Sequence, residues 1–533
     1  MRTPTQKQRP RKAEFTSFAS PTDGLISNRN LAMARGPDVG PGAEVLENWF
    51  PTATGVVLRR GVERKASIVE DDPVRSIFNY ASGTTKKLFA AVSTGIRDIT
   101  TVVDRNDWVG PDVLTGQTSP NWNVVQYSTA GGEFLIGVNG ADDGFLYDGS
   151  TFGALSITFP GGSTLTTNDL AYVWVYKQRI WFIEKDSLNA WYLPVDSIAG
   201  ELTLWPMGGV FTRGGTLTWG QAWSLDSGGA GGLSEQCVFV STEGEVAAYQ
   251  GLSPAADQGW AKVGQYRIGV PLGDKAFARA GGDIIIATTV GLVSLASASR
   301  NDYAALGQNA VSYPIEDDWA RAILERGQID WRMDIWPDKQ MAIVSPPAII
   351  GNVPMVFVIN VNTGKWCKFT SWCIRSIGLF MGDLFFGCAD GSVKEAWIGG
   401  TDEGAPYTGK VLPLFSDLGA PGSLKTVKTA RAVVLSSFKV KPKLTGMSNF
   451  SVNFPNPPNL GIPVAGSEWD AGIWGASLWD SERAEVVISD WVPVSGYGHD
   501  LSIGMQITGG SITPADAELV RIDLTYEIGG IGT

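Results

Sequence analysis

Few side chains in this sequence are of the types that carry out nucleophilic or metal-dependent chemistry. The sequence contains one histidine, His499, in the glycine-rich segment 496–500, and it has no Gly-x-Ser-x-Gly segment that would present a nucleophilic serine. None of its four cysteines has Cys-x-x-Cys spacing; they are Cys237, Cys367, Cys373 and Cys388. We therefore expect a loop histidine, small buried cysteines, no disulfide framework, no zinc site and no cofactor.

Paired carboxylates are the remaining kind of catalytic group that the sequence could supply. Glycosidases use two carboxyl groups about 5–9 Å apart. The close pairs in this sequence are Asp142 with Asp143, Asp317 with Asp318, and Glu243 with Glu245. Residues 362–366 resemble a degenerate Asp-box turn of sialidases, but the segment occurs once and lacks the aspartate, so a hairpin turn is the simpler interpretation. The alternative hypothesis is thus a carbohydrate-active or carbohydrate-binding propeller, in which some of the 20 tryptophans stack on sugar rings.

The composition indicates that strands must position any such groups. The chain has 533 residues, of which 65 are glycine, 10% are aromatic and only 18% are charged. Glycine is well above its usual ~7% and follows no collagen period. A long helical bundle would need more Ala, Glu, Lys and Leu. A chain of this length also exceeds one compact core, so we predict an all-β protein of several domains or repeats.

A strand–turn–strand pattern recurs along the middle of the chain. Apolar strands begin at residues 87, 133, 179, 237, 283, 340 and 383, with spacings between 43 and 58 residues. Such a period, with two strand signals in each unit, is typical of propeller blades. We predict a β-propeller of six or seven blades over residues 62–410, with apolar strands such as 284–286 as its inner strands. Aromatic residues of the outer strands should fill the gaps between blades: Trp191, Tyr249, Trp366 and Trp397.

Both ends of the chain follow other patterns. Residues 1–61 are predicted to form an N-terminal arm and the first strands, and 1–45 should become ordered only on assembly because they are polar and rich in Pro and Gly. Residues 411–533 are predicted to form a C-terminal β-sandwich-like domain with strands at 428–440, 485–489 and 519–526. One short helix is expected over 313–324. We expect no secretion signal and no membrane span.

The charges are unevenly distributed. The net charge is −12, which disfavours general nucleic-acid binding because phosphates would be repelled. Residues 1–13 and 418–467 nevertheless carry basic side chains and no acidic ones. These segments could be a solvated tail and the outer face of a hairpin, or basic patches that dock an acidic neighbouring subunit. An acidic surface elsewhere, if it lined a channel, would let DNA slide past without sticking.

Several segments resemble a known protein family. Residues 46–51 (Leu-Glu-Asn-Trp-Phe-Pro), 55–61 (Gly-Val-Val-Leu-Arg-Arg-Gly) and 122–149 (ending Leu-Tyr-Asp-Gly) are similar to the N-terminal part of tail proteins of short-tailed bacteriophages. That family is the nozzle proteins, also called tail tubular protein B or packaged-DNA stabilisation proteins. The tryptophan-rich segment 469–480 and the terminal segment 524–530 fit the same family.

The resemblance implies a structural virion protein and not an enzyme. Nozzle proteins form a hexameric ring below the portal and adaptor rings, surround the DNA exit channel, retain packaged DNA, support tail fibres or spikes, and open for DNA ejection. The implied partners are further copies of this chain, the adaptor ring, fibres or spikes, and DNA bound without sequence specificity. The implied location is the virion tail, after synthesis in the host cytoplasm. The residues that could dock such partners are Trp49, Phe50, Arg59, Arg60, Lys425, Lys428, Arg431, Lys439, Lys441 and Lys443.

Overall fold

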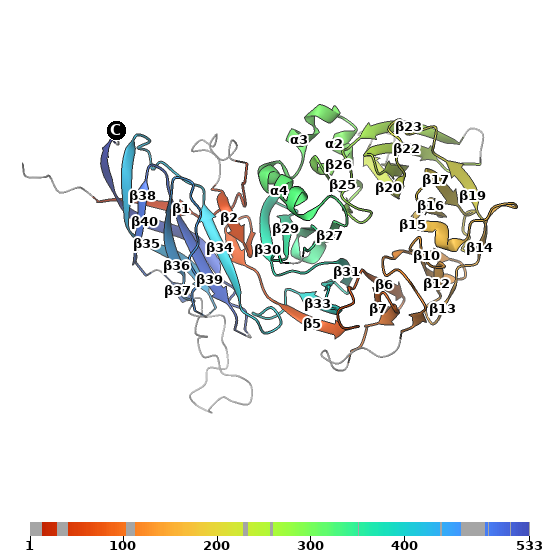
Figure 1. The fold of residues 1–533 in the computed structure, drawn as a ribbon, viewed down its shortest axis with the longest axis horizontal. Helices are drawn as coiled ribbons and strands as arrows, with labels where there is room; N and C mark the ends of the chain where they lie inside the picture. Colours follow the sequence, from red (N-terminus) through yellow and green to blue (C-terminus); the bar gives the residue numbers. More distant parts are fainter. Residues whose placement is uncertain are drawn as a thin grey trace, which may run out of the picture. The chain divides into compact units, whose positions relative to one another are not determined.

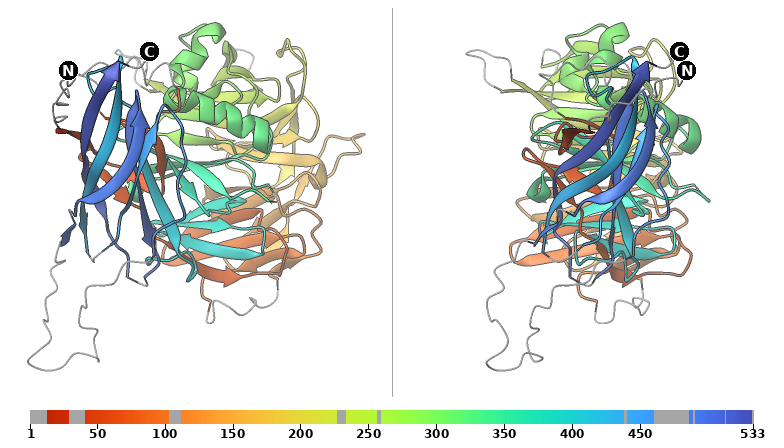
Figure 2. Two further views of the ribbon diagram at one scale, coloured as in Figure 1. Left: turned by 60° about the vertical axis from the view of Figure 1, so that its left-hand side comes forward. Right: turned by 90° about the vertical axis from the view of Figure 1, so that its left-hand side faces the viewer.

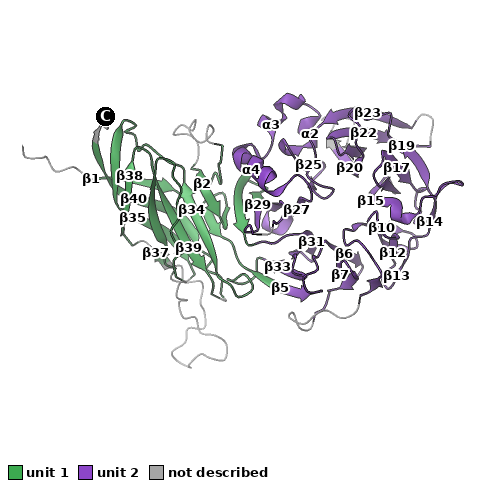
Figure 3. Ribbon diagram, in the orientation of Figure 1, with its two compact units in different colours: residues 1–63, 357–371, 397–533 green, residues 64–356, 372–396 purple. Residues whose placement is uncertain are grey.

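The protein consists of two compact units. The computed structural model describes residues 13–28, 41–102, 112–226, 233–255, 259–349, 351–437, 440–459, 486–488, 490–511 and 513–531. Unit 1 comprises residues 1–63, 357–371 and 397–533, and unit 2 comprises residues 64–356 and 372–396 (Figure 3). This division differs from the boundaries expected from the sequence, because 357–371 and 397–410 belong with both ends of the chain and not with the propeller.

Unit 2 is a β-propeller. Within the described part of unit 2, seven small antiparallel sheets are arranged around a common axis (Figure 1). Sheets 1 to 3 contain β6 (Ser76–Ser82), β7 (Thr85–Val92), β8 (Gly95–Asp98), β9 (Leu114–Thr115); β10 (Asn123–Thr129), β11 (Gly132–Val138), β12 (Phe145–Tyr147), β13 (Phe152–Ala154); and β15 (Leu170–Tyr176), β16 (Arg179–Glu184), β17 (Asn189–Tyr192), β19 (Thr203–Pro206). Sheets 4 to 7 contain β20 (Leu217–Asp226), β21 (Leu233–Ser241), β22 (Glu245–Gly251), β23 (Trp260–Arg267); β24 (Phe277–Ala280), β25 (Asp283–Thr288), β26 (Gly291–Ser294); β27 (Arg332–Trp336), β28 (Met341–Ser345); and β31 (Ser376–Phe380), β32 (Asp383–Gly387), β33 (Ser392–Ala396), β5 (Val62–Ser67). A separate parallel pair joins β14 (Ile157–Thr158) to β18 (Gly200–Glu201).

The sequence recurrence marks the second strand of every sheet. Its seven start positions fall in or within a residue of β7, β11, β16, β21, β25, β28 and β32. The prediction of a propeller is confirmed, but the strands taken as innermost are second from the axis. The first strand of each sheet precedes them and faces the centre of the ring. The second strands are apolar because a neighbouring sheet covers each of their two faces.

The first and last parts of unit 2 meet in sheet 7. Strand β5, of which residues 64–67 belong to unit 2, lies beside β33, so the strand that precedes sheet 1 in the chain completes the last sheet. Gly391 permits this closure. Its φ is +78°, and a Cβ at this position would lie 1.6 Å from the carbonyl oxygen of Val69. The backbone N–H of Val74 then donates to the carbonyl of Cys388 at 3.0 Å, which ties the start of sheet 1 to sheet 7.

Aromatic side chains fill the spaces between neighbouring sheets. Trp181 of sheet 3 lies 5.6 Å from Trp260 of sheet 4 in a stacked arrangement, and Trp205 of sheet 3 lies edge-to-face with Tyr249 of sheet 4 at 5.7 Å. Trp191 is also buried, against Phe159. The predicted role of the aromatic residues therefore holds for Trp191 and Tyr249, whereas Trp366 and Trp397 belong to unit 1.

Helices are short and follow sheet 5. They are α2 (Leu295–Ala298), η2 (Tyr303–Ala305), α3 (Leu306–Asn309), η3 (Tyr313–Ile315), α4 (Glu316–Arg326) and, after β27, η4 (Pro337–Lys339); η1 (Thr167–Asp169) precedes β15. The helix expected over 313–324 is confirmed as η3 followed by α4, whose first turn carries three acidic residues that favour its N-terminal end. None of the helices in the described residues combines the length and apolarity of a membrane span.

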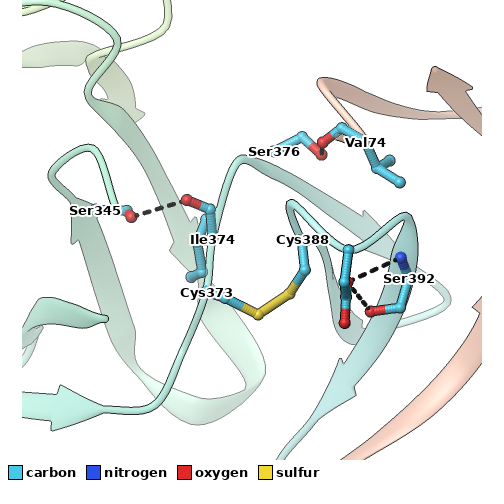
Figure 4. The surroundings of a disulfide bond; sticks show 8 residues. Val74, Ser345, Cys373, Ile374, Ser376, Cys388 and Ser392 are labelled. Carbon is cyan, nitrogen blue, oxygen red and sulfur yellow. Dashed lines mark hydrogen bonds between the residues drawn. A yellow bond between two sulfur atoms is a disulfide. The ribbon is translucent and has the colours of Figure 1, made fainter. Parts of the chain in front are cut away.

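A disulfide in sheet 7 corrects the expectation for the cysteines. Cys373, before β31, is bonded to Cys388, after β32, across a sequence separation of 15 residues (Figure 4). The sequence spacing did not indicate this pair because the β31–β32 hairpin, and not a Cys-x-x-Cys turn, brings the two Cα atoms to 5.2 Å. Cys237 and Cys367 are free and buried, as expected.

Unit 1 is a β-sandwich-like assembly of two sheets. One sheet has the order β3-β4-β40-β35-β37, with β1 also paired to β40 and β38 to β35; its long strands β35 and β40 lie side by side (Figure 2). The other belongs to an eight-stranded sheet, whose strands in unit 1 have the order β29-β30-β2-β34-β39-β36. The strands are β1 (Ala13–Ala19), β2 (Ala43–Glu47), β3 (Trp49–Pro51), β4 (Val56–Leu58), β29 (Met355–Asn360), β30 (Lys365–Thr370), β34 (Tyr407–Pro413), β35 (Ser423–Ser436), β36 (Lys443–Ser448), β37 (Val486–Ile488), β38 (Val492–Gly498), β39 (Leu501–Gly509) and β40 (Glu518–Ile531).

The expected arm is partly built into this unit. Strand β1 pairs with β40 over seven residues, from Ala13 with Glu527 to Ala19 with Arg521. Residues 13–19 therefore form a strand with β40 of the same chain, whereas the ordering of 1–45 on assembly stays a prediction. Residues 1–12 and 29–40 lie outside the described residues. The expected strands at 428–440, 485–489 and 519–526 correspond to β35, β37 and β40.

Candidate functional site

The first strands of the propeller sheets surround a cavity on its axis. The cavity has a volume of about 480 Å³, and six of the seven sheets contribute to its wall, through or beside β6, β10, β15, β24, β27 and β31. Charged and polar side chains occupy one part of the wall, and aromatic and aliphatic side chains occupy the rest. We call this space the axial cavity.

Arg332 holds the charged part of the axial cavity together. Its guanidinium donates to the Asp274 carboxylate at 2.9 Å, to Asp330 at 2.6 Å and to the Asn121 side-chain oxygen at 3.1 Å. Arg75 pairs with the other oxygen of Asp330. Arg332 is only 3% exposed, whereas the side chain of Asp274 keeps 27% exposure toward the cavity. The network links sheets 1, 2, 5 and 6 through charge-assisted hydrogen bonds.

Lys275 lies beside this network, and its ammonium has no carboxylate within hydrogen-bonding distance among the described residues. Its ammonium donates to the carbonyl oxygen of Trp122 at 2.5 Å, to Ser76 Oγ at 3.2 Å and to Asn121 Oδ1 at 3.3 Å. Burial, together with the neighbouring Arg332 charge, lowers the pKa of Lys275 to about 7. Burial alone would raise the pKa of Asp274, but the charges of Arg332 and Lys275 reverse this effect and hold it below its usual value.

Asp334 and Arg279 lie further along the same two inner strands. A parallel bridge pairs Lys275 with Arg332, so two residues onward Phe277 is level with Asp334, and Arg279 follows Phe277 by two more. The carboxylate of Asp334 accepts one hydrogen bond, from the backbone N–H of Ile335 at 2.8 Å. Burial raises the pKa of Asp334 to about 6 because no cation compensates its charge.

The arrangement is suited to binding small polar molecules. The described residues that line the cavity include no cysteine or histidine, and no group of three potential metal ligands occurs in the described part of the chain. Ser76 Oγ accepts a hydrogen bond from the Lys275 ammonium at 3.2 Å, so a serine and a basic group do meet in the cavity. Asp334 has a carboxyl group that exchanges its proton near neutral pH, which is the property of a general acid or of a ligand-binding group.

The carboxylate pairs noted in the sequence do not line this cavity. Asp142 accepts hydrogen bonds from Thr118 and Ser119 and thereby fixes a turn, and Asp143 accepts from Thr167. Glu245 accepts from Thr212 and the backbone of Arg213. Asp318 is buried in α4 near Arg321, and Asp317 and Glu243 lie on the surface or partly so. Asp142, Asp143 and Glu245 therefore have local structural roles.

Four of the ten proposed docking residues are buried inside unit 1. Trp49 is 0%, Phe50 7%, Arg59 1% and Lys425 0% exposed. Arg59 forms a two-pronged pair with Asp402 and donates to the side chain of Asn48 at 2.8 Å. The ammonium of Lys425 donates to three backbone carbonyl oxygens. These four side chains belong to the core of unit 1. They do not form a docking surface within this chain, because the sheets of unit 1 enclose them.

The other proposed docking residues lie nearer the surface, and most have partners. Arg60 pairs with Asp516, Lys428 with Glu527 and Arg431 with Asp523. Lys443 donates to the carbonyl of Asn456, Lys441 is exposed, and Lys439 lies outside the described residues. Within this run, Lys428 and Arg431 are therefore neutralised by carboxylates, because β35 pairs with β40, which carries Glu527 and Asp523.

The remaining sequence-based sites are turns. His499 lies between β38 and β39, as expected of a loop histidine. Residues 362–366 lie in the turn and first strand residues of the β29–β30 hairpin, where the side chain of Asn360 accepts from the backbone N–H groups of Asn362 and Thr363. The aromatic run 469–480 lies outside the described residues.

The fold defines the class of this protein as an all-β protein with a seven-bladed propeller and a second β unit. No protein-family model matches the sequence, and no curated protein matches it. The chain is similar in structure to the BBS1N–ARL6DN crystal structure (TM-score 0.35, 10% identity, 66% of this chain and 97% of that one). It is also similar to the β-propeller domain of Cps50 (Swd1) from Myceliophteria thermophila (TM-score 0.38, 10% identity, 63% of this chain and 99% of that one). A third similar structure is Sqt1 from Saccharomyces cerevisiae (TM-score 0.32, 11% identity, 64% of this chain and 98% of that one).

Proposed function

We propose that this chain is a structural protein of a short bacteriophage tail, which assembles with further copies into the distal ring, or nozzle, around the DNA exit channel. In this role it retains packaged DNA, contacts the adaptor ring below the portal, supports fibres or spikes, and performs no catalysis. The primary support is the sequence resemblance of residues 46–61, 122–149 and the C-terminal segments to nozzle proteins.

Two of the resembling residues, Asn48 and Arg59, lie in the core of unit 1. Asn48 and Arg59 form a buried hub: Asn48 donates to Thr370 at 2.7 Å and to the Thr408 carbonyl at 2.8 Å, while Arg59 binds Asp402. Its guanidinium also lies 4.1 Å from the centre of the Tyr407 ring. Breaking a buried pair of this kind is costly, so the resembling residues would be retained to build the fold.

The small cavity on the propeller axis favours a role in which each propeller borders the DNA channel and DNA does not pass through the propeller itself. The Arg332 network occupies one part of an axial cavity of only about 480 Å³, which is far too small for a DNA duplex. In a ring of several chains, DNA would pass between the copies and not through each propeller. The net charge of −12 favours a surface that repels phosphates.

The experiment is to locate the chain on a particle and count its copies. Intact virions carrying a tagged form of the chain are imaged by negative-stain electron microscopy, and the isolated tail is weighed by native mass spectrometry. The proposal expects about six copies in a ring at the distal end of the tail, and a tagged portal protein is the positional control. A monomer that is absent from purified tails would contradict it.

A carbohydrate-binding or carbohydrate-active propeller is the second candidate, and Asp334 in the axial cavity is the observation that favours it. Incubating the protein with the host's surface glycan and following reducing ends tests for cleavage. Release of sugars that is lost in Asp334→Asn would support this second candidate over the nozzle.

A further inference from the structure

The axial cavity contains two opposite charges that the protein does not pair. Within the described residues, Asp334 accepts a hydrogen bond only from its neighbouring backbone N–H, and Arg279, whose side chain is exposed at the edge of the cavity, has no hydrogen bond or ion pair. By contrast, Arg332, Arg75 and Lys275 in the same cavity are engaged with Asp274, Asp330 or oxygen acceptors. An uncompensated carboxylate in a cavity costs stability, so its presence calls for a ligand or another function.

Apolar side chains line the cavity beside these two charges. Phe277 lies level with Asp334 and is partly exposed, and its ring stacks on Trp219 with centroids 4.0 Å apart. Ile335, Ile377 and Phe78 are other partly exposed members of the wall. A few polar groups set among aromatic and aliphatic side chains are the usual composition of a small-molecule site.

We propose that the axial cavity binds a small organic acid that also carries a hydrogen-bond donor. The anionic group of the ligand pairs with Arg279, the donor binds the carboxylate of Asp334, and the carbon skeleton packs on Phe277. The cavity volume of about 480 Å³ matches the range of about 300–1,000 Å³ for such sites. The donor could be an ammonium, as in an amino acid, or a hydroxyl, as in a sugar acid. The proposal is independent of ring assembly.

Isothermal titration calorimetry on the full chain tests this site. The probes are phenylalanine, which supplies an ammonium, glucuronate, which supplies hydroxyls, and acetate, which has a carboxylate and no donor. We expect phenylalanine or glucuronate to bind with a Kd below about 1 mM and acetate at least about tenfold more weakly. Which of the two binds identifies the donor.

Variants locate the binding. Arg279→Gln and Asp334→Asn should each weaken the binding probe about tenfold or more, whereas Arg300→Gln and Glu325→Gln, which alter exposed charges of unit 2 outside the cavity, should change it less than about twofold. Circular dichroism and thermal melting check that each variant folds, and Asp334→Ser replaces Asp334→Asn if the latter does not. Absence of binding by both probes, or binding unaffected by these variants, overturns the proposal.

Discussion

At the scale of one residue, the carboxyl group of Asp334 lies in a cavity where its charged form is unfavourable. The folded protein retains the Asp334 proton up to a pKa of about 6, whereas the unfolded chain releases it near its usual pKa of 3.8. The folded state therefore binds more protons than the unfolded state between these values. By linkage, this carboxyl group makes the protein less stable as the pH rises through that window.

Asp334→Asn is expected to raise the free energy of unfolding by roughly 2 kcal/mol at pH 7, because the amide needs no counter-charge. The gain should fade by pH 4, where the parent side chain is itself protonated. Urea unfolding at both pH values measures the effect, with Glu325→Gln as the exposed control. A variant less stable than the parent at pH 7 would show that the charge is compensated.

Trp49 makes a contrasting, apolar contribution. It is fully buried in unit 1, where Gly409 is packed so closely that a Cβ there would lie 2.5 Å from the indole nitrogen. Trp49→Ala should cost about 3–5 kcal/mol, since the cavity that it leaves is not refilled. Thermal melting compares it with Tyr497→Ala, an aromatic residue of the same unit that is 62% exposed and should have little effect. Equal melting temperatures for the two variants would be inconsistent with a core role.

Residue-level pairing was the part that the sequence could not reveal. The basic residues of 418–467 looked unopposed, yet Lys428 and Arg431 meet Glu527 and Asp523 almost a hundred positions later. The axial network is similarly scattered, because it joins residues 75, 121, 274, 330 and 332. Each of these residues is ordinary in its local context, and only ring closure brings them together.

At the scale of elements, the apolar or polar character of each strand's side chains determined what could be predicted. The second strands of the sheets are apolar and recur visibly, so the propeller and its approximate blade count followed from them. The first strands face the axial cavity and include polar residues such as Ser76, Asn123 and Arg332, which conceal the apolar alternation of a strand. The strands that carry the candidate site were therefore the ones the pattern missed.

The Cys373–Cys388 bond stabilises one such element, the β31–β32 hairpin. Replacing both cysteines with serine should lower the free energy of unfolding by about 3 kcal/mol, as expected for a cross-link closing a loop of this length. The urea midpoint of the oxidised parent should fall to that of the variant when a reductant is added, and the variant should not respond. Identical midpoints for oxidised and reduced parent would mean that the hairpin is held by its hydrogen bonds alone.

At the scale of the whole molecule, the charge balance bears on the proposed contact with DNA. With a net charge of −12, and with Lys428 and Arg431 of β35 already paired to carboxylates, we expect the chain to gain little from releasing counterions from phosphates. We expect duplex DNA to bind with a Kd weaker than about 10⁻⁴ M at physiological salt. Fluorescence anisotropy with a labelled duplex measures this, and a basic protein of similar size is the positive control. Binding of duplex DNA with a micromolar Kd would contradict the proposal that DNA passes this chain without being held by it.

The placement of β5 beside β33 also has a consequence during synthesis on the ribosome. Ser67 at the end of β5 is translated 325 residues before Ser392 at the start of β33. At about 5–20 residues per second, the nascent chain would wait roughly 15–65 s for that partner. Throughout this interval β5 would present an unpaired edge, so newly made chains would depend on chaperones to prevent premature association with one another.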